Sequence, residues 1–412
     1  MCLRVLGPDR GANDGICAQR DLPDRHPGLV SFGMASAGRI QVPFGRPEID
    51  ERDIRAVTNV MCSGWIAYGP QIGRFEESLA TYVGSRAAVT LNSCTSALEA
   101  VLQVSGIGGE VVVPSFTWVA VANAVVNSGA VPRFADVDRA TFNLTPESVA
   151  SAIGPRTEAV IVPHYGGQPA DISGIRSICG NRGILLIEDC AETMGGIRDG
   201  RMAGSGGIGC FSFYPTKAIT SGMGGAVVSD DVSLVDRIRT WATHGLRSST
   251  PVDGSPHRPW ERSAEMPGRN LRMPNMLAAL GLEQLARLDE LNGRRRAAAR
   301  IYDELFAGID DVFVPEIAPR TKHVYQMYSL RLPAHHRDVV LRHLWEVGIC
   351  ANTHFDPPIH AQPCYERSGT AAANLPVTES LRREVLTIPI FPSITDREIA
   401  AVFDGVQGGL RG

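Results

Sequence analysis

The central part of the chain alternates short apolar runs with stretches of helical spacing. The apolar runs have the length of β-strands and lie at residues 88–91, 110–114, 133–137, 159–163, 184–187, 210–214 and 225–228. Apolar positions with a helical period separate most of them, at residues 96–104, 119–126, 146–153 and 232–243. Strands that alternate with helices predict an α/β domain with a large, mostly parallel sheet covered on both faces. Ligands of such sheets bind at the carboxyl ends of the strands.

The pattern changes after residue 245. A polar stretch at 246–269 reads as a long loop, and a long helical pattern follows at 274–306. Beyond it the sequence predicts a strand, a helix, a strand and a helix, at residues 324–332, 335–347, 385–390 and 395–406. We therefore predict a large domain at 41–290 and a smaller α+β domain at 291–412. Residues 1–40 follow neither period and predict a flexible N-terminal extension.

Composition and charge narrow the class of protein. The formal net charge of -4 supplies no excess of positive charge for binding nucleic acid or an anionic membrane. No apolar stretch has the length of a membrane span, and no secretory signal is present at the N-terminus. The nine cysteines are scattered and never in C-x-x-C spacing, which indicates free thiols in a reducing compartment. We predict a cytoplasmic protein without nucleic-acid or membrane partners.

Lysine is almost absent from this chain. Of the 40 basic residues only Lys217 and Lys322 are lysines. Arginine cannot lose its proton at accessible pH and act as a nucleophilic amine, so a retained lysine is a candidate for Schiff-base chemistry. Lys217 is the stronger candidate, because it follows an apolar strand and precedes a glycine-rich turn at 221–225. The simple alternative is an exposed loop lysine.

A carboxylate stands at the end of a second predicted strand. The apolar run 184–187 leads directly into Glu188 and Asp189. A carboxylate buried there needs a cation, and the protonated nitrogen of a pyridine ring is one such cation. The alternative for Asp189 is a helix N-cap.

Two further features suit a phosphorylated, planar ligand. The run 92–96 places several hydroxyl and amide side chains at a strand-to-helix junction, where backbone N–H groups bind phosphate. Plain helix capping explains one of these hydroxyls equally well. Trp118, just after the strand at 110–114, could stack on a planar ring, although a lone tryptophan is more often a core residue.

Other motifs fail on their context. The run 204–209 matches G-x-G-x-x-G but precedes a strand, whereas dinucleotide binding requires the glycines to follow a strand and open a helix. His335 and His336 are adjacent and would face different directions on a helix, and we predict no metal site.

Six motifs in order resemble those of the DegT/DnrJ/StrS family of sugar aminotransferases. The similarity extends from about Val42 to the end of the chain, and its motifs are Gly69–Pro70 with Phe75–Glu76, 94–98, 114–118, 188–192, 212–217 and 270–273. The resemblance implies an α/β protein of aminotransferase fold type I. It also implies dependence on pyridoxal 5′-phosphate (PLP) and a homodimer with composite active sites.

The resemblance also implies roles for single residues. Lys217 would bond covalently to PLP, Asp189 would pair with its pyridine nitrogen, and Trp118 would stack on its ring. The phosphate would be held by Cys94, Thr95 and Ser212, and Asn270 would reach in from the partner subunit. Glu192 would lie near the phenolate oxygen of PLP. The sequence departs from the family at Cys94, where glycine or another small residue is usual, and at Glu192, where glutamine or histidine is common.

Transamination in two halves is the activity that the resemblance implies. L-Glutamate would donate the amino group and a keto-sugar linked to a nucleoside diphosphate would accept it, in amino-sugar biosynthesis. The nine-residue turn 217–225 has the length found in relatives that aminate carbon 4. Amination at carbon 3, a cyclitol ketone as acceptor, or a non-catalytic PLP-binding or regulatory role are the alternatives. We expect His323, Tyr325 and His354 among the residues that contact substrate.

Overall fold

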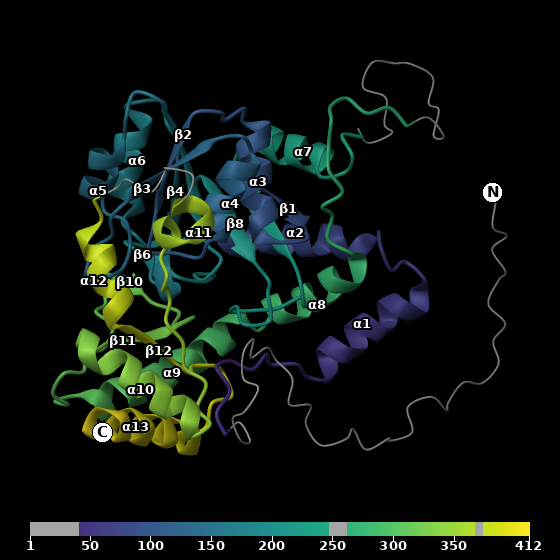
Figure 1. Cartoon of the computed structure of the whole chain (residues 1–412). Coiled ribbons are helices and arrows are strands. Elements are labelled where there is room, and N and C mark those ends of the chain that lie inside the picture. Colours follow the sequence, from purple (N-terminus) through teal and green to yellow (C-terminus); the bar gives the residue numbers. More distant parts are fainter. Residues whose placement is uncertain (1–40, 247–261, 367–373) are drawn as a thin grey trace, which may run out of the picture.

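A seven-stranded sheet forms the centre of the protein in a computed structural model that describes residues 41–246, 262–366 and 374–412 (Figure 1). The strands run in the order β1-β9-β8-β5-β4-β2-β3. Neighbours pair in parallel except β9, which runs antiparallel to both β1 and β8. The predicted mostly parallel sheet is confirmed. The strands are β1 (Ala87–Leu91), β2 (Glu110–Pro114), β3 (Val131–Ala135), β4 (Thr157–Pro163), β5 (Leu185–Asp189), β8 (Ile208–Ser212) and β9 (Gly225–Ser229).

Helices cover both faces of this sheet because its central strands are apolar on both sides. Val111 and Val113 of β2 pack with one set of helices, α3 (Cys94–Val104), α4 (Ala120–Asn127) and α7 (Val232–Trp241). Val112 faces the opposite way, toward α5 (Pro146–Ala152) and α6 (Ile172–Gly180). On that second side of the sheet, α2 (Pro70–Val83) and α8 (Asn275–Leu285) cover β1, β8 and β9.

The C-terminal part has an apolar core of its own. Its strands β11 (Tyr328–Arg331) and β12 (Val385–Ile388) pair antiparallel. Around them lie α9 (Leu288–Phe306), α10 (Ala334–Glu346), α12 (Pro376–Glu384) and α13 (Asp396–Arg411). Val42, near the beginning of the described chain, joins this core. On this basis we propose to keep the domain division near residue 290.

The remaining elements are short, apart from one helix. A small sheet joins β6 (Ile197–Arg198), β7 (Arg201–Met202) and β10 (Thr321–Lys322). Single turns of helix occur at η1 (Tyr165–Gly167), η2 (Ile359–Ala361) and α11 (Pro363–Glu366). Helix α1 (Glu51–Ser63) is longer and lies along α8; Asp50 caps its first turn, and Gly64 ends it with a φ of 75°. No helix of the described residues is long and apolar enough to cross a membrane.

Two predicted elements differ in the structure, and two other predictions concern residues that lie wholly or mostly outside the described part of the chain. The helical pattern 274–306 forms two helices, α8 and α9, because Arg287 turns away to pair with Asp50 and Asp53. The predicted strand 324–332 shrinks to 328–331, because the amides of Val324 and Met327 bond to the turn at Gly166 and Gly167 instead. The predicted extension 1–40 and most of the predicted loop 246–269 lie outside the described residues.

Candidate active site

Three strands end at the same edge of the sheet and carry the predicted residues. Asp189 is the last residue of β5 and Ser212 the last of the neighbouring β8, with Asp189 paired to Cys210 in register. Ser212, Gly225 and Leu91 form one row across β8, β9 and β1. Lys217 follows β8 by five residues. The strand ends therefore bring Lys217, Asp189 and the beginning of α3 to one place.

The Lys217 amine is paired with a carboxylate. Its Nζ donates to Glu192 Oε1 at 3.2 Å, and both side chains are less than one-fifth exposed. The other oxygen of Glu192 accepts the backbone N–H of Gly166 at 3.0 Å. Glu192 is thus fixed between the Lys217 amine and the turn that follows β4.

Asp189 is a buried carboxylate that has two donors on one of its oxygens. Oδ1 accepts the Ala191 N–H at 3.0 Å and the Cys94 S–H at 3.7 Å. Burial raises the pKa of Asp189, while the backbone hydrogen bond and the charge of Lys217 oppose the rise. Burial also raises the pKa of the Cys94 thiol, which therefore remains a protonated donor. The anionic form of Asp189 needs a further cation to be stable here.

The beginning of α3 lies beside Asp189. Ser93 caps the helix by accepting the Ser96 N–H, and the helix begins at Cys94, with Thr95 half-buried behind it. A Cβ on Gly225 would lie 2.2 Å from the carbonyl carbon of Ser93, so only glycine lets β9 approach this closely. The helix N-terminus carries partial positive charge and suits an anion.

Trp118 and Asn270 lie on the surface of the chain. Trp118 is 61% exposed in the turn between β2 and α4, with its ring centroid 6.4 Å from that of Phe355. Asn270 is also exposed, and its side-chain oxygen accepts from Arg272 at 3.1 Å. The next residue, Leu271, accepts the Asn92 N–H at 2.8 Å, so this segment passes beside the end of β1.

The three histidine and tyrosine candidates separate into two places. His354 lies within electrostatic reach of Lys217 and Glu192, and burial lowers its pKa to about 4. Its buried Nδ1 has no hydrogen-bond partner among the described residues. His323 and Tyr325 stack on each other with ring centroids 4.1 Å apart, and Tyr325 belongs to the C-terminal core. The adjoining Gln326 contacts the lysine segment by donating to the carbonyl of Thr216.

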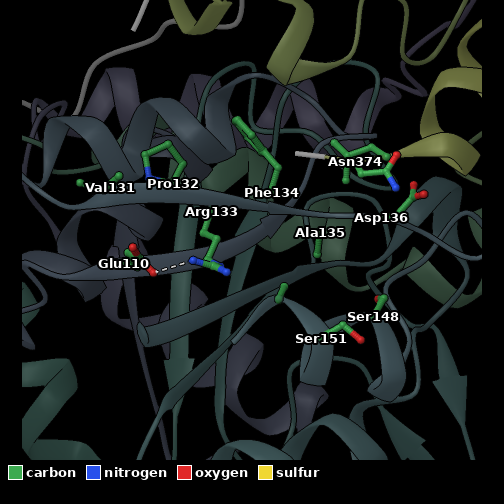
Figure 2. Close-up of a pocket in the computed structure, with 12 residues that line it drawn as sticks. Glu110, Val131, Pro132, Arg133, Phe134, Ala135, Asp136, Ser148, Ser151 and Asn374 are labelled. Carbon is green, nitrogen blue, oxygen red and sulfur yellow. Dashed lines mark hydrogen bonds and ion pairs between the residues drawn. The ribbon is translucent and has the colours of Figure 1, made fainter. Parts of the chain in front are cut away.

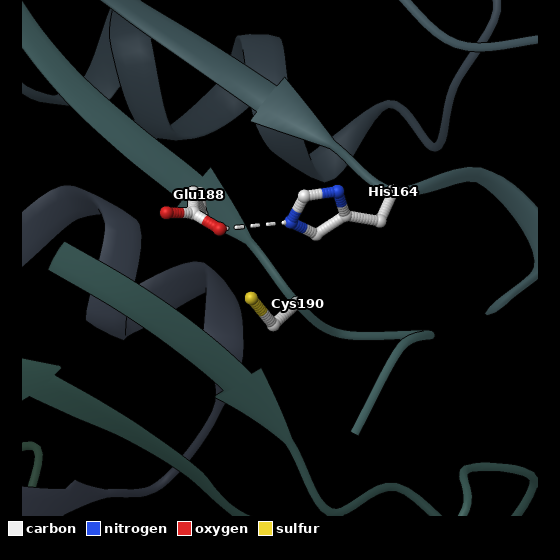
Figure 3. A group of neighbouring side chains, drawn as sticks. All are labelled: His164, Glu188 and Cys190. Carbon is white, nitrogen blue, oxygen red and sulfur yellow. Dashed lines mark hydrogen bonds and ion pairs between the residues drawn. The ribbon is translucent and has the colours of Figure 1, made fainter. Parts of the chain in front are cut away.

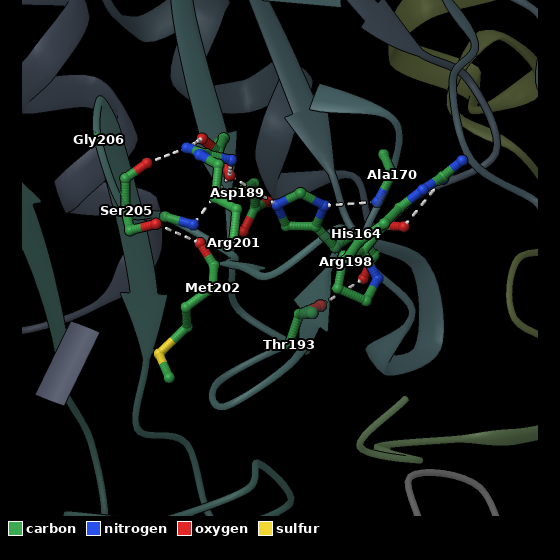
Figure 4. A network of polar contacts seen from close by, with 12 residues as sticks. His164, Ala170, Asp189, Thr193, Arg198, Arg201, Met202, Ser205 and Gly206 are labelled. Atoms are coloured by element: carbon green, nitrogen blue, oxygen red, sulfur yellow. Dashed lines mark hydrogen bonds and ion pairs between the residues drawn. The ribbon is translucent and has the colours of Figure 1, made fainter. Parts of the chain in front are cut away.

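A buried polar network lies behind Asp189 on the other side of β5. His164, Glu188 and Cys190 bring possible metal-ligating atoms within 4.8 Å of one another (Figure 3). Glu188 already accepts from His164, Arg176, Arg201 and the Gly204 N–H. Figure 4 shows His164 and Arg201 in this network. Burial acts to raise the pKa of Glu188, but the hydrogen bonds from His164 and Arg201 outweigh it and set the pKa at about 2. We interpret this group as a support for the end of β5, because its oxygens are already used.

A hollow in the described residues lies away from these residues. It measures about 600 Å³ and lies beside the edge strand β3, with Glu110, Arg133 and Asp136 on its wall (Figure 2). Arg133 pairs with Glu110 at 3.3 Å, and Asp136 accepts the amides of Val377 and Thr378. None of the predicted site residues lines it.

Sequence reasoning missed several residues around Lys217. The turn at Gly166 and Gly167 supports Glu192. The sequence could have indicated it, because this turn follows a predicted strand that ends at the same edge of the sheet as the strand before Asp189. Arg295 of α9 donates to the carbonyls of Lys217 and Ala218. Nothing in the sequence distinguishes Arg295 from the many other arginines of this chain.

Comparison with known proteins places this arrangement among aminotransferases. The model of the DegT/DnrJ/EryC1/StrS aminotransferase family matches residues 47–407. The spore coat polysaccharide biosynthesis protein SpsC of Bacillus subtilis is 34% identical over 380 residues, which cover 90% of this chain and 97% of SpsC. The structure of the aminotransferase TlmJ from Streptoalloteichus hindustanus has a TM-score of 0.84 and 34% identity, covering 90% of this chain and 99% of TlmJ. DesV from S. venezuelae, solved with a ketimine intermediate, has a TM-score of 0.82 and 34% identity, covering 90% and 98%.

Proposed function

This chain belongs to the DegT/DnrJ/EryC1/StrS aminotransferase family, and on that premise we propose that it aminates carbon 4 of a keto-sugar linked to a nucleoside diphosphate, with L-glutamate as donor. It is a PLP-dependent aminotransferase. The donor, the nucleotide and the carbon atom are the parts that we propose. SpsC, a relative, takes part in the biosynthesis of a spore coat polysaccharide.

The residues at the sheet edge fit PLP. Asp189 is buried with a raised pKa and needs a cation, which the protonated pyridine nitrogen would be. The surface made by Gly225 and the beginning of α3 would accept the phosphate, together with Cys94, Thr95 and Ser212. Lys217 is within electrostatic reach of Asp189, as residues that bind two parts of one ring must be. Trp118 would cover the ring.

PLP supplies an aldehyde that bonds covalently to amines and a ring that withdraws electrons from the adjacent carbon. The chain supplies the acids and bases. The Nζ of Lys217 would hold the cofactor at rest and, when free, would accept and donate the proton that moves during transamination. Asp189 would keep the proton on the pyridine nitrogen. Glu192 accepts a hydrogen bond from Lys217 Nζ and holds the amine on the side of the Gly166 turn.

An exposed apolar surface supports the proposal of a homodimer. Helix α1 and the segment that follows it carry large apolar side chains that are about half exposed or more, namely Ile54, Met61, Trp65, Ile66 and Tyr68. Contiguous exposed apolar residues of this size mark an interface. The backbone of Trp65 and Ile66 bonds to Asn275 and Met276 at the beginning of α8, so the surface is rigidly held. We propose that a second copy covers it and contributes Asn270 to the opposite site.

The substrate side of the proposal rests on fewer observations. His354 is next to Lys217 and Glu192 and has a free buried nitrogen among the described residues, which suits a hydrogen bond to substrate. The turn from Lys217 to Gly225 supports carbon 4 by its length. His323 and Tyr325 would act at the site only through the neighbouring Gln326.

The observation that carries the proposal is the convergence of Lys217, Glu192 and Asp189 at the ends of two adjacent strands. We would load the protein with PLP, add L-glutamate, and measure 2-oxoglutarate and the loss of the covalent absorbance band. Nucleotide-linked 4-keto and 3-keto sugars would then be offered, with the amine detected by mass spectrometry. We expect an aminated 4-keto sugar, and none with Lys217→Arg, which keeps the charge but cannot bond to PLP.

The other outcomes separate the alternatives. A product from the 3-keto sugar or a cyclitol ketone alone would overturn the position that we propose. PLP binding without any reaction with L-glutamate would favour a non-catalytic role. Full turnover by Lys217→Arg would remove Lys217 from the mechanism.

A further inference from the structure

Three consecutive backbone carbonyls at the lysine are bound by side chains from a distant part of the chain. The carbonyl of Thr216 accepts from Gln326 Nε2. The carbonyls of Lys217 and Ala218 accept from the guanidinium of Arg295 at 3.2 and 3.3 Å. On the other side, the Lys217 N–H donates to Tyr214 at 2.9 Å. The backbone of the lysine is therefore held on both sides, independently of the contact between its amine and Glu192.

Arg295 is unusual because its charge is buried. The residue is only 5% exposed. Glu48 lies within electrostatic reach of it, but no carboxylate forms an ion pair with Arg295 among the described residues. Its Nε is buried without a partner there, and burial lowers the pKa of Arg295 to about 10. A buried guanidinium is costly unless it is paired. An apolar residue would pack here more cheaply, so the grip on the two carbonyls is the feature that explains the arginine.

The helix that carries Arg295 connects two apolar cores. Leu288 and Leu291, at the beginning of α9, pack with α2 and α8 against the large sheet. Tyr302 and Phe306, near its end, belong to the C-terminal core. Arg295 lies between these two sets of contacts and points to the lysine turn. If the C-terminal core moves relative to the sheet, the part of α9 that carries Arg295 connects the moving and the fixed parts.

Gln326 makes a second connection to the same place. The amides of the flanking Val324 and Met327 bond to the carbonyls of Gly167 and Gly166. Gly167 has a φ of 104°, and a Cβ at this position would lie 2.9 Å from the backbone nitrogen of Gln326. The Gly166 N–H in turn holds Glu192, the partner of Lys217. The segment 324–327 therefore contacts both the backbone of the lysine turn and the support of the lysine amine.

We propose that Arg295 and Gln326, which we call the carbonyl clamp, are positioning residues that return the Lys217 amine to one place each time PLP releases it. The inference rests on the proposed function, in which Lys217 bonds to PLP. The clamp contacts the carbonyls of residues 216–218 and would act on the amine through this backbone. Displacement of a reacting group by about 1 Å can cost a hundredfold in rate.

The test measures covalent capture of PLP by the full-length apoprotein. The rate is followed by the absorbance of the covalent form and by borohydride trapping with mass spectrometry at Lys217. Arg295→Met removes the grip but fills the same space, and Gln326→Leu releases the carbonyl of Thr216. Arg295→Lys keeps one donor. Arg294→Met is the matched control, because Arg294 is on the same helix but is half exposed and paired with Glu290.

We expect Arg295→Met to capture PLP about tenfold to a hundredfold more slowly, with kcat lowered and the KM for L-glutamate within about twofold. Gln326→Leu should slow capture less, Arg295→Lys should recover part of the rate, and Arg294→Met should match the wild type. Wild-type capture rates in both clamp variants would overturn the proposal. The proposal would also be overturned if the slower capture of PLP disappears once the rate is corrected for the fraction of folded protein, which thermal unfolding measures. A wild-type protein that never bonds to PLP at Lys217 would instead defeat the proposed function.

Discussion

At the scale of single residues, Cys94 is the departure from the family pattern whose effect the geometry defines best. Its thiol donates to Asp189 Oδ1 at 3.7 Å, and this hydrogen bond favours the charged carboxylate. Cys94→Ala should therefore raise the pKa of Asp189 further and weaken PLP binding by about 0.5–1 kcal/mol, roughly twofold to fivefold. Titration of the apoprotein with PLP would measure it. Cys179→Ala removes a buried thiol in α6, far from the site, and should leave PLP affinity unchanged.

A buried histidine predicts how stability depends on pH. Burial lowers the pKa of His323 to about 3, from 6.5, and its Nδ1 accepts the Tyr325 N–H. Between pH 6.5 and 3 the unfolded chain binds a proton at this residue and the folded chain does not. Stability should therefore fall as pH falls through this window, by up to roughly 1.4 kcal/mol per pH unit from His323 alone. Urea unfolding at pH 4.5, 5.5 and 6.5 would show a shallower slope for His323→Asn, and an identical slope would contradict the assignment.

The sequence identifies a site residue only where its residue type or its sequence context is unusual. Lys217 stood out because the chain has almost no lysine, and Asp189 because a carboxylate ended an apolar strand. Arg295 has no such signal, since its importance lies in burial and in two backbone contacts made across 77 residues or more. His323 is equally ordinary in sequence, and its low pKa comes only from the packing around it.

At the scale of elements, close approach of backbone decides the shape of the site. Gly225 at the beginning of β9 contacts the backbone of Ser93 and Cys94 where α3 begins. Gly225→Ala must push this helix end away, so we expect a loss of about 1–3 kcal/mol in stability and weaker binding of PLP through its phosphate. Gly73→Ala is the matched control, because a Cβ at this position in α2 meets nothing within 4 Å. This substitution should raise the free energy of unfolding by about 1 kcal/mol or less. Thermal unfolding with and without PLP distinguishes the two effects, and equal PLP affinity in both variants would refute this role for Gly225.

Element boundaries followed from sequence only where local chemistry sets them. The seven apolar runs all appear as strands, because a buried parallel strand needs a continuous apolar stretch. The break between α8 and α9 carries no glycine or proline. Arg287 at the break forms ion pairs with Asp50 and Asp53, which lie more than 200 residues earlier in the sequence. The two-residue strands β6 and β7 are too short to show a period of two at all.

At the scale of the whole molecule, the position of Asn270 distinguishes a site made by one chain from one made by two. Its exposed side chain bonds to Arg272 rather than to any residue of the Lys217 cluster. The proposed dimer would bring the Asn270 of the second chain to this cluster. An isologous interface places both copies of the residue symmetrically, so each dimer has two equivalent composite sites.

Mixing two inactive variants tests this arrangement directly. Lys217→Ala should abolish transamination, and Asn270→Ala should reduce it strongly. In a mixed dimer, one site then has both defects, whereas the other combines an intact Lys217 from one chain with an intact Asn270 from the other. Random reassociation makes half of the dimers mixed, and each has one working site, so the mixture should recover about one quarter of wild-type activity. Sites complete within a single chain would give no recovery on mixing, because every chain carries one defect. Native mass spectrometry of the same mixture, with one variant carrying a mass tag, verifies that mixed dimers have formed. An absence of recovery then counts against the shared site.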